Sequence, residues 1–327
     1  MLWHRRCFIQ TLGDSNTTVM MKAMTEKTIR KEISCNGIGL HSGKAIELKL
    51  LPAAGGSGVV FIRKDLGSGP IAADAAHVIS THLSTTIGIE GATVQTIEHL
   101  LAAVFALEID NLIVEVNGPE VPILDGSAAP FVALLLEAGI ASQERARSFI
   151  EFLKPVTVSE KGKYVTIRPG SSFDIAYQIL FDHPLISNQS YFYRHSRQAF
   201  MKEIAPARTF GFLKDVERLK AQGLAQGGSL ENAIVIGDDQ ILNKQGLRFS
   251  NEFVRHKILD LIGDFSLLGM PILGHVEAFC SGHMLHAKLI QEVLVNKEAW
   301  KIVAPPSGNR QKVYSSYQSL SSSISST

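Results

Sequence analysis

The chain has 327 residues, of which 45% are hydrophobic, so it exceeds the usual single-domain length and has enough apolar content for about two domains. A formal net charge of +1 gives no electrostatic reason to expect nucleic acid or another strongly charged partner. The cysteines are scattered without a Cys-x-x-Cys pair, which argues against a disulfide framework and a thiolate zinc site and for a reducing compartment: Cys7, Cys35 and Cys280.

Both ends of the chain are expected to lie outside the folded part. Residues 1–25 are polar and include Met24 as a second possible start, so we interpret them as a disordered extension. A targeting peptide is the alternative, because Arg5 and Arg6 precede any acidic residue, but no clear amphipathic helix follows. Residues 305–327 are Ser-rich and bury too little apolar surface to offset their ordering entropy. No apolar run reaches the roughly 18 residues of a membrane span, and we expect a cytoplasmic protein.

Strands precede helices in the N-terminal half of the chain. The hydrophobic patterns predict a strand at 28–34, a Gly-rich turn, a strand at 45–51, a buried helix from Glu98, a strand at 111–116 and a helix at 127–138. This order predicts a first α+β domain over residues 26–144.

The same order of elements recurs after a polar stretch at 141–148, which we interpret as a linker. The patterns then predict strands at 155–159, 164–168 and 173–180, a helix at 251–268, a further strand, and a helix at 283–296. A second α+β domain is therefore expected over residues 149–304. The repeat is one of topology, because no residue-level repeat is evident.

Four side chains in two segments could form a hydrolytic metal site. His256 and Asp260 are four residues apart on a predicted helix, so both could bind one ion, and His99 could be a third ligand. Glu98, next to His99, could act as the base that a metal hydrolase needs. In the alternative, Asp264 extends the stripe and the polar face of the helix simply contacts water.

Glu98 and His99 begin a segment, 100–107, that is apolar on all sides and reads as a buried helix. Burying ionisable side chains is costly unless they are paired or bind a metal. The position of these two residues therefore favours a functional site.

Six sequence blocks, in order, carry a resemblance to a known family. They are Gly37-Ile38-Gly39-Leu40-His41-Ser42-Gly43, Thr96-Ile97-Glu98-His99-Leu100-Leu101-Ala102-Ala103, Pro122-Ile123-Leu124-Asp125-Gly126-Ser127, Ala207-Arg208-Thr209-Phe210-Gly211-Phe212, the run 253–264 around Arg255-His256-Lys257, and Ser281-Gly282-His283. Over residues 29–303 the chain closely resembles the zinc-dependent UDP-3-O-acyl-N-acetylglucosamine deacetylases of lipid A synthesis. It departs from that family at no position used for chemistry.

The resemblance implies a fold, a reaction and a metal. The fold would comprise two similar α+β domains whose helices pack between two sheets, with the active site where the domains meet. The reaction would be zinc-dependent removal of the N-acetyl group from UDP-3-O-(3-hydroxyacyl)-N-acetylglucosamine. His99, His256 and Asp260 match the zinc ligands, and Glu98 matches the general base. A His-His-Asp site could also hold Fe2+ in the cell.

The resemblance also assigns roles outside the metal cluster. His283, held by Asp264, would protonate the leaving amine, and Thr209 would donate to the developing oxyanion. From the sequence alone, His283 could instead be a helix cap, and the Thr209 hydroxyl could bond its own backbone.

Lys257, Phe210, His41 and Phe212 match substrate-binding positions, and an insert near 212–228 would hold the acyl chain. The alternatives are a solvated Lys257, a polar turn residue at His41 and core packing for the insert. The expected partner is one small UDP-sugar substrate, bound by a monomer. Two rival functions are another zinc amidohydrolase and a noncatalytic nucleotide-sugar or acyl-carrier binding module.

Overall fold

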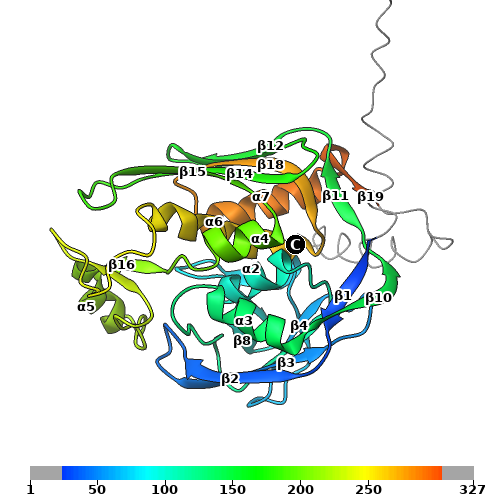
Figure 1. Ribbon diagram of the computed structural model, residues 1–327, viewed down its shortest axis with the longest axis horizontal. Helices are drawn as coiled ribbons and strands as arrows, with labels where there is room; N and C mark the ends of the chain where they lie inside the picture. The colour runs from blue at the N-terminus through cyan, green and yellow to red at the C-terminus, as the bar shows by residue number, and fades with distance from the viewer. Residues whose placement is uncertain (1–23, 304–327) are drawn as a thin grey trace, which may run out of the picture.

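The computed structural model describes residues 24–303, and the predictions for residues 1–23 and 304–327 lie outside this range. Two sheets form the outer layers and the main helices lie between them (Figure 1). This arrangement confirms the α+β fold class and the expected packing of helices between sheets. None of the described helices is long and apolar enough to cross a membrane.

The first sheet has five strands in the order β2-β3-β9-β4-β5. The elements of this half are β1 (Thr25–Ile29), β2 (Ile33–Ile38), β3 (Ala45–Pro52), β4 (Val59–Arg63), β5 (Ile71–Ala72), β6 (Val78–Ser80), β7 (Thr86–Ile89), β8 (Ala92–Val94), α2 (Glu98–Ala106), β9 (Leu112–Val116), α3 (Ala129–Ala138) and β10 (Ile140–Ala146). Strands β6, β7 and β8 form a small separate sheet beside the first.

The second sheet has seven strands, with β18 at its centre between β13 and β14. The elements of this half are β11 (Phe149–Phe152), β12 (Val156–Glu160), β13 (Lys163–Arg168), β14 (Phe173–Leu180), β15 (Asn188–Arg194), α4 (Arg197–Ala199), β16 (Phe210–Phe212), α5 (Leu213–Ala221), β17 (Ile234–Ile236), α6 (Glu252–Phe265), β18 (Ile272–Phe279), α7 (His283–Val295) and β19 (Trp300–Val303). The predicted 155–159 and 164–168 hairpin is present as β12 and β13.

Two predictions about the first half were wrong. The segment 28–34 is two strands rather than one, because the chain bends at exposed residues 30–32 and β1 and β2 then pair in different sheets. The supposed linker at 141–148 forms most of β10, which pairs with β1. Its polar side chains are used in tertiary contacts, since Gln143 bonds both Asn111 and the carbonyl oxygen of Ala53. The boundaries 26–144 and 149–304 remain a proposed division.

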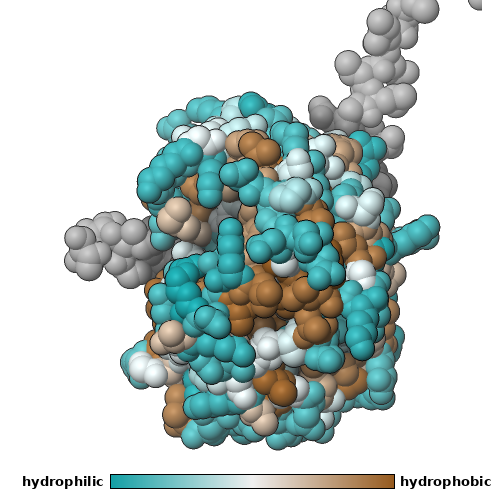
Figure 2. Space-filling view, turned by 90° about the vertical axis from the view of Figure 1, so that its left-hand side faces the viewer, coloured by the Kyte–Doolittle hydropathy of each residue, from teal (hydrophilic) through white to brown (hydrophobic). Residues whose placement is uncertain are grey.

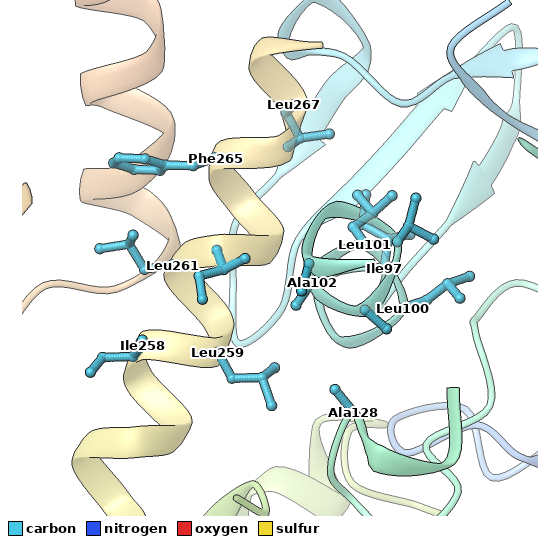
Figure 3. Packing of buried hydrophobic residues seen from close by; sticks show 14 of the residues in the cluster. Ile97, Leu100, Leu101, Ala102, Ala128, Ile258, Leu259, Leu261, Phe265 and Leu267 are labelled. Carbon is cyan, nitrogen blue, oxygen red and sulfur yellow. The ribbon is translucent and has the colours of Figure 1, made fainter. Parts of the chain in front are cut away.

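The core joins the two halves through α2 and α6. Helix α2 is buried on nearly every side, as its uninterrupted apolar sequence predicts. Figure 3 shows Ala102 of α2 facing α6, while Phe265 of α6 points toward α7. The apolar side chains of α2 and α6 thus pack between the two halves of the molecule.

Candidate metal centre and active site

Helices α2 and α6 cross at the centre of the molecule and bring the predicted metal ligands together. Glu98 and His99 are the first two residues of α2, whereas His256 and Asp260 lie one turn apart on α6. Gly263 permits the crossing, because a Cβ there would lie 2.0 Å from the carbonyl oxygen of Glu98. The close approach of the two helices therefore requires a residue without a side chain.

His99, His256 and Asp260 form a buried cluster whose ligand atoms lie within 4.8 Å of one another. Asp260 Oδ1 is 3.3 Å from His256 Nε2 and 3.6 Å from His99 Nε2. His256 Nδ1 donates to the carbonyl oxygen of Ala207 at 3.1 Å, which leaves Nε2 to face the cluster. Burial lowers the pKa of His256 to about 3, so its imidazole is neutral and can bind a metal.

Lys257 lies beside this cluster. Its Nζ donates to Asp260 Oδ2 at 2.7 Å and lies 5.5 Å from the centre of the Phe210 ring. Although Lys257 is one residue from His256 on the helix, its flexible side chain reaches the next turn. The alternative of a freely solvated lysine is therefore wrong.

Glu98 lies between the metal cluster and the start of α7. Its Oε2 accepts a hydrogen bond from the backbone N–H of Thr85 at 3.1 Å, and its Oε1 is 3.8 Å from His283 Nε2. Burial raises the pKa of Glu98, although the neighbouring His283 and His99 act in the opposite direction. A buried carboxyl with a raised pKa is suited to accept a proton near neutral pH.

Asp264, one turn beyond Asp260, holds His283 from the other side. Asp264 Oδ2 accepts from His283 Nδ1 at 2.7 Å, and Oδ1 accepts from the Thr85 hydroxyl at 2.6 Å. Burial opposes protonation of His283, but the charges of Asp264 and Glu98 outweigh it and raise its pKa to about 10. The His283 imidazole is therefore held as a cation and a proton donor.

His286 is a polar residue of this site that the sequence reasoning missed. Its Nδ1 donates to the same Asp264 oxygen at 2.7 Å, and its Nε2 is 3.0 Å from Ser281 Oγ, which is 2.8 Å from Tyr177 OH. His286 follows His283 by three residues on α7, a spacing that could have indicated a shared partner. Thr85 lies in a loop and gave no sequence signal.

One pocket is lined by most of the residues predicted to bind the metal, the substrate or the transferred protons. Its lining includes His41, Glu98 and His99 from the first half of the chain. From the second half it includes Thr209, Phe210, His256, Lys257, Asp260 and His283. The backbone N–H of Thr209 donates to Gly126 and its carbonyl oxygen accepts from Ile234, and its hydroxyl makes no hydrogen bond within residues 24–303. Asp264 lies outside the pocket wall, behind His283.

Phe212 and the insert lie to one side of this pocket. The Phe212 ring is 5.9 Å from that of Phe181 and 5.3 Å from that of His183. Helix α5 has no buried residue, and Leu213 is 48% exposed, so core packing does not explain its apolar residues. Figure 2 views the molecule from the side on which α5 and β16 lie, and a hollowed hydrophobic area occupies the centre of that face.

Comparisons with known proteins agree with this geometry. A family model described as UDP-3-O-acyl N-acetylglycosamine deacetylase matches residues 26–295. A protein of Syntrophus aciditrophicus called UDP-3-O-acyl-N-acetylglucosamine deacetylase is 48% identical over 276 residues, covering 84% of this chain and 88% of that protein. Proteins of the same name from Myxococcus xanthus and Geotalea uraniireducens are 49% and 48% identical, covering 85% and 86% of this chain and 89% and 92% of their own lengths.

Proposed function

Because the chain belongs to the UDP-3-O-acyl-N-acetylglucosamine deacetylase family, we propose that it hydrolyses the N-acetyl group of a UDP-3-O-acyl-N-acetylglucosamine. The products are acetate and the free amine, in the committed step of lipid A synthesis. One observation carries the assignment to this chain. Three potential metal ligands, the buried carboxyl of Glu98 and the cationic imidazole of His283 all line one pocket.

His99, His256 and Asp260 are the proposed ligands of a divalent metal, with Zn2+ the first candidate and Fe2+ the second. These residues suit such an ion because two imidazoles and one carboxylate, all buried, place their ligand atoms close together. His256 Nδ1 is already bonded to Ala207, so Nε2 is free for the ion. When bound, the metal supplies Lewis-acid chemistry that acidifies water and polarises the amide carbonyl.

Glu98 and His283 divide the proton transfers between them. Glu98 takes the proton from the attacking water, for which its raised pKa suits it. His283 donates the proton of its imidazolium to the amine nitrogen as the C–N bond breaks, and Asp264 orients the ring through Nδ1. Thr209 donates its hydroxyl to the developing oxyanion, and loss of such a donor costs on the order of 3 kcal/mol of barrier.

Substrate binding is assigned to the residues around this chemistry. Lys257 places a positive charge at the pocket, and Phe210, whose ring lies beside it, provides a flat apolar surface for the sugar. His41 also lines this pocket. Phe212 and α5 belong to the insert near 212–228. The apolar side chains of α5, none of which is buried, are suited to hold an acyl chain.

A noncatalytic binding module is the alternative function. A binding module would need the pocket but no proton-transfer groups. The buried Glu98 carboxyl, 3.8 Å from the His283 imidazole, therefore supports the catalytic proposal. The experiment is acetate release by the purified chain from UDP-3-O-(3-hydroxyacyl)-N-acetylglucosamine, with UDP-N-acetylglucosamine as the control lacking the acyl group. We expect release from the acylated substrate only. Tight binding of both compounds without acetate release would support the binding module.

The monomeric state and the cytoplasmic location are further parts of this proposal. The pocket is built entirely from one chain, so a second copy is not required to complete it. Size-exclusion chromatography with light scattering and cell fractionation test these two statements.

A further inference from the structure

Glu120 is fully buried and lies beneath the wall of the pocket that carries His41. No ion pair within residues 24–303 involves this carboxylate. Its oxygens instead accept from the backbone N–H of His41 at 3.0 and 3.1 Å, the backbone N–H of Ser42 at 2.9 Å, and the hydroxyl of Thr96 at 2.8 Å. Burying a carboxylate costs free energy of folding unless it is hydrogen-bonded, so these four hydrogen bonds stabilise Glu120 in its buried position.

On one side, Glu120 fixes the loop that carries His41. Gly39 allows the carboxylate to come close, because a Cβ at Gly39 would lie 2.4 Å from Glu120 Oε2. His41 is itself buried, and its Nε2 has no hydrogen-bond partner in the described part of the chain. Since His41 lines the pocket, we expect this unbonded nitrogen to bind a polar group of the substrate.

The same loop also holds the insert. The backbone N–H of Gln226 donates to the carbonyl oxygen of His41 at 3.2 Å, and that of Gly227 donates to the carbonyl oxygen of Leu40 at 3.0 Å. A Cβ at Gly227 would lie 2.3 Å from the carbonyl oxygen of Gly39, so the two segments are in close contact. A shift of the His41 loop would therefore move the insert.

On its other side, Glu120 fixes the segment that leads into α2. Thr96 has a φ of 58°, a strained value for a β-branched residue, and its hydroxyl is bonded to Glu120. The next residue, Ile97, is the N-cap of α2, which begins with Glu98 and His99. One carboxylate thus connects the loop of His41 to the start of the helix that carries the proposed base.

We propose that Glu120 is a positioning residue that sets the distance between the His41 loop, with its attached insert, and the proposed catalytic groups at the start of α2. The proposal rests on the proposed function. Because Glu120 lies behind the wall of the pocket, it acts on substrate binding through His41 and residues 225–228. Loss of its bonds is therefore expected to affect KM more than kcat.

The test compares Glu120→Gln and Glu120→Ala with the control Glu115→Gln, whose carboxylate is on β9 and pairs with Lys64. We expect KM for the acylated substrate to rise about tenfold or more in Glu120→Ala and less in Glu120→Gln, with kcat within about threefold. Bound metal and the control variant should be unchanged. A fall in kcat alone, or kinetics equal to the wild type, would overturn the proposal.

Gly39→Ala is a second variant for the case in which Glu120→Ala does not fold. It displaces the loop from the carboxylate without removing a charge, and the same rise in KM is expected. Calorimetric titration of the metal-free proteins with the acylated substrate gives the comparison without turnover. A wild type that binds the substrate when metal-free but releases no acetate when loaded with metal contradicts the proposed function. Equal affinities of the wild type and Glu120→Ala contradict this inference.

Discussion

A Cβ atom at Gly263 would lie 2.0 Å from the carbonyl oxygen of Glu98. This contact is the point at which α6 crosses α2, and it lies between Asp260 and Asp264 in the sequence. The two helices supply the three proposed metal ligands and the proposed base. Because Gly263 has no side chain, α2 and α6 lie close enough to bring the proposed metal ligands and the proposed base together.

Gly263→Ala is expected to push the helices apart. Overpacking of this kind costs about 1–3 kcal/mol of folding free energy, and displacement of positioned groups by about 1 Å lowers turnover about 100-fold. Acetate release and thermal unfolding measure the two effects. Gly69→Ala is the matched control, because a Cβ at Gly69 has no neighbour within 4 Å. Wild-type kinetics in Gly263→Ala would show that the helix spacing does not matter.

Glu98→Ala and His256→Ala are expected to fail in different ways. Glu98→Ala should keep the metal and lose most turnover, because its carboxyl is assigned to proton transfer. His256→Ala should weaken metal binding itself, because it removes one of three proposed ligands. Metal analysis after dialysis, together with acetate release, separates the two results. Equal metal loss in both variants would contradict the division of roles.

The rate is expected to depend on pH in two steps. Glu98 must be deprotonated, so kcat/KM rises as pH increases through its raised pKa. His283 must be protonated, so kcat/KM falls as pH increases toward the His283 pKa of about 10, and a bound cation moves this fall to lower pH. In His283→Gln the alkaline fall should disappear from the residual activity. A persistent alkaline fall in that variant would assign the second step to another group.

His286 is expected to support His283 through Asp264. Asn in place of His286 can still present an N–H to Asp264, whereas Leu cannot, and Leu would leave Ser281 Oγ and Asp264 each without one partner. We expect His286→Leu to lower kcat about tenfold and His286→Asn to keep most of it. Steady-state kinetics at fixed pH provide the comparison. Equal kcat values in the two variants would show that His286 does not act through its hydrogen bond to Asp264.

The parts of the site that the sequence predicted are those with a local pattern or a family motif. His256 and Asp260 are one helical turn apart, and Glu98 and His99 interrupt an apolar helix at its first turn, so their joint burial was expected. The contacts of Thr85 and Glu120 connect residues 179 and 79 positions apart in the chain. No single-segment pattern contains such pairings, which form only when the sheets and helices pack.

The fold was predicted where the elements are strongly periodic and missed where polar residues take part in tertiary contacts. The helix beginning at Glu98 and the hairpin of β12 and β13 agree with their patterns. The polar composition of residues 141–148 predicts a linker, but most of this stretch is strand β10. Gln143 bonds to Asn111 and Arg145 pairs with Glu26. A polar strand of this kind can be recognised only through its partners.

The central claim is that the His99, His256 and Asp260 cluster binds a metal on which deacetylation depends. Its most direct test is acetate release from UDP-3-O-(3-hydroxyacyl)-N-acetylglucosamine by the purified chain, before and after a chelator, with stepwise return of Zn2+. We predict that the chelator abolishes release and that about one equivalent of Zn2+ restores it. Full acetate release from protein verified to be free of metal would contradict the claim.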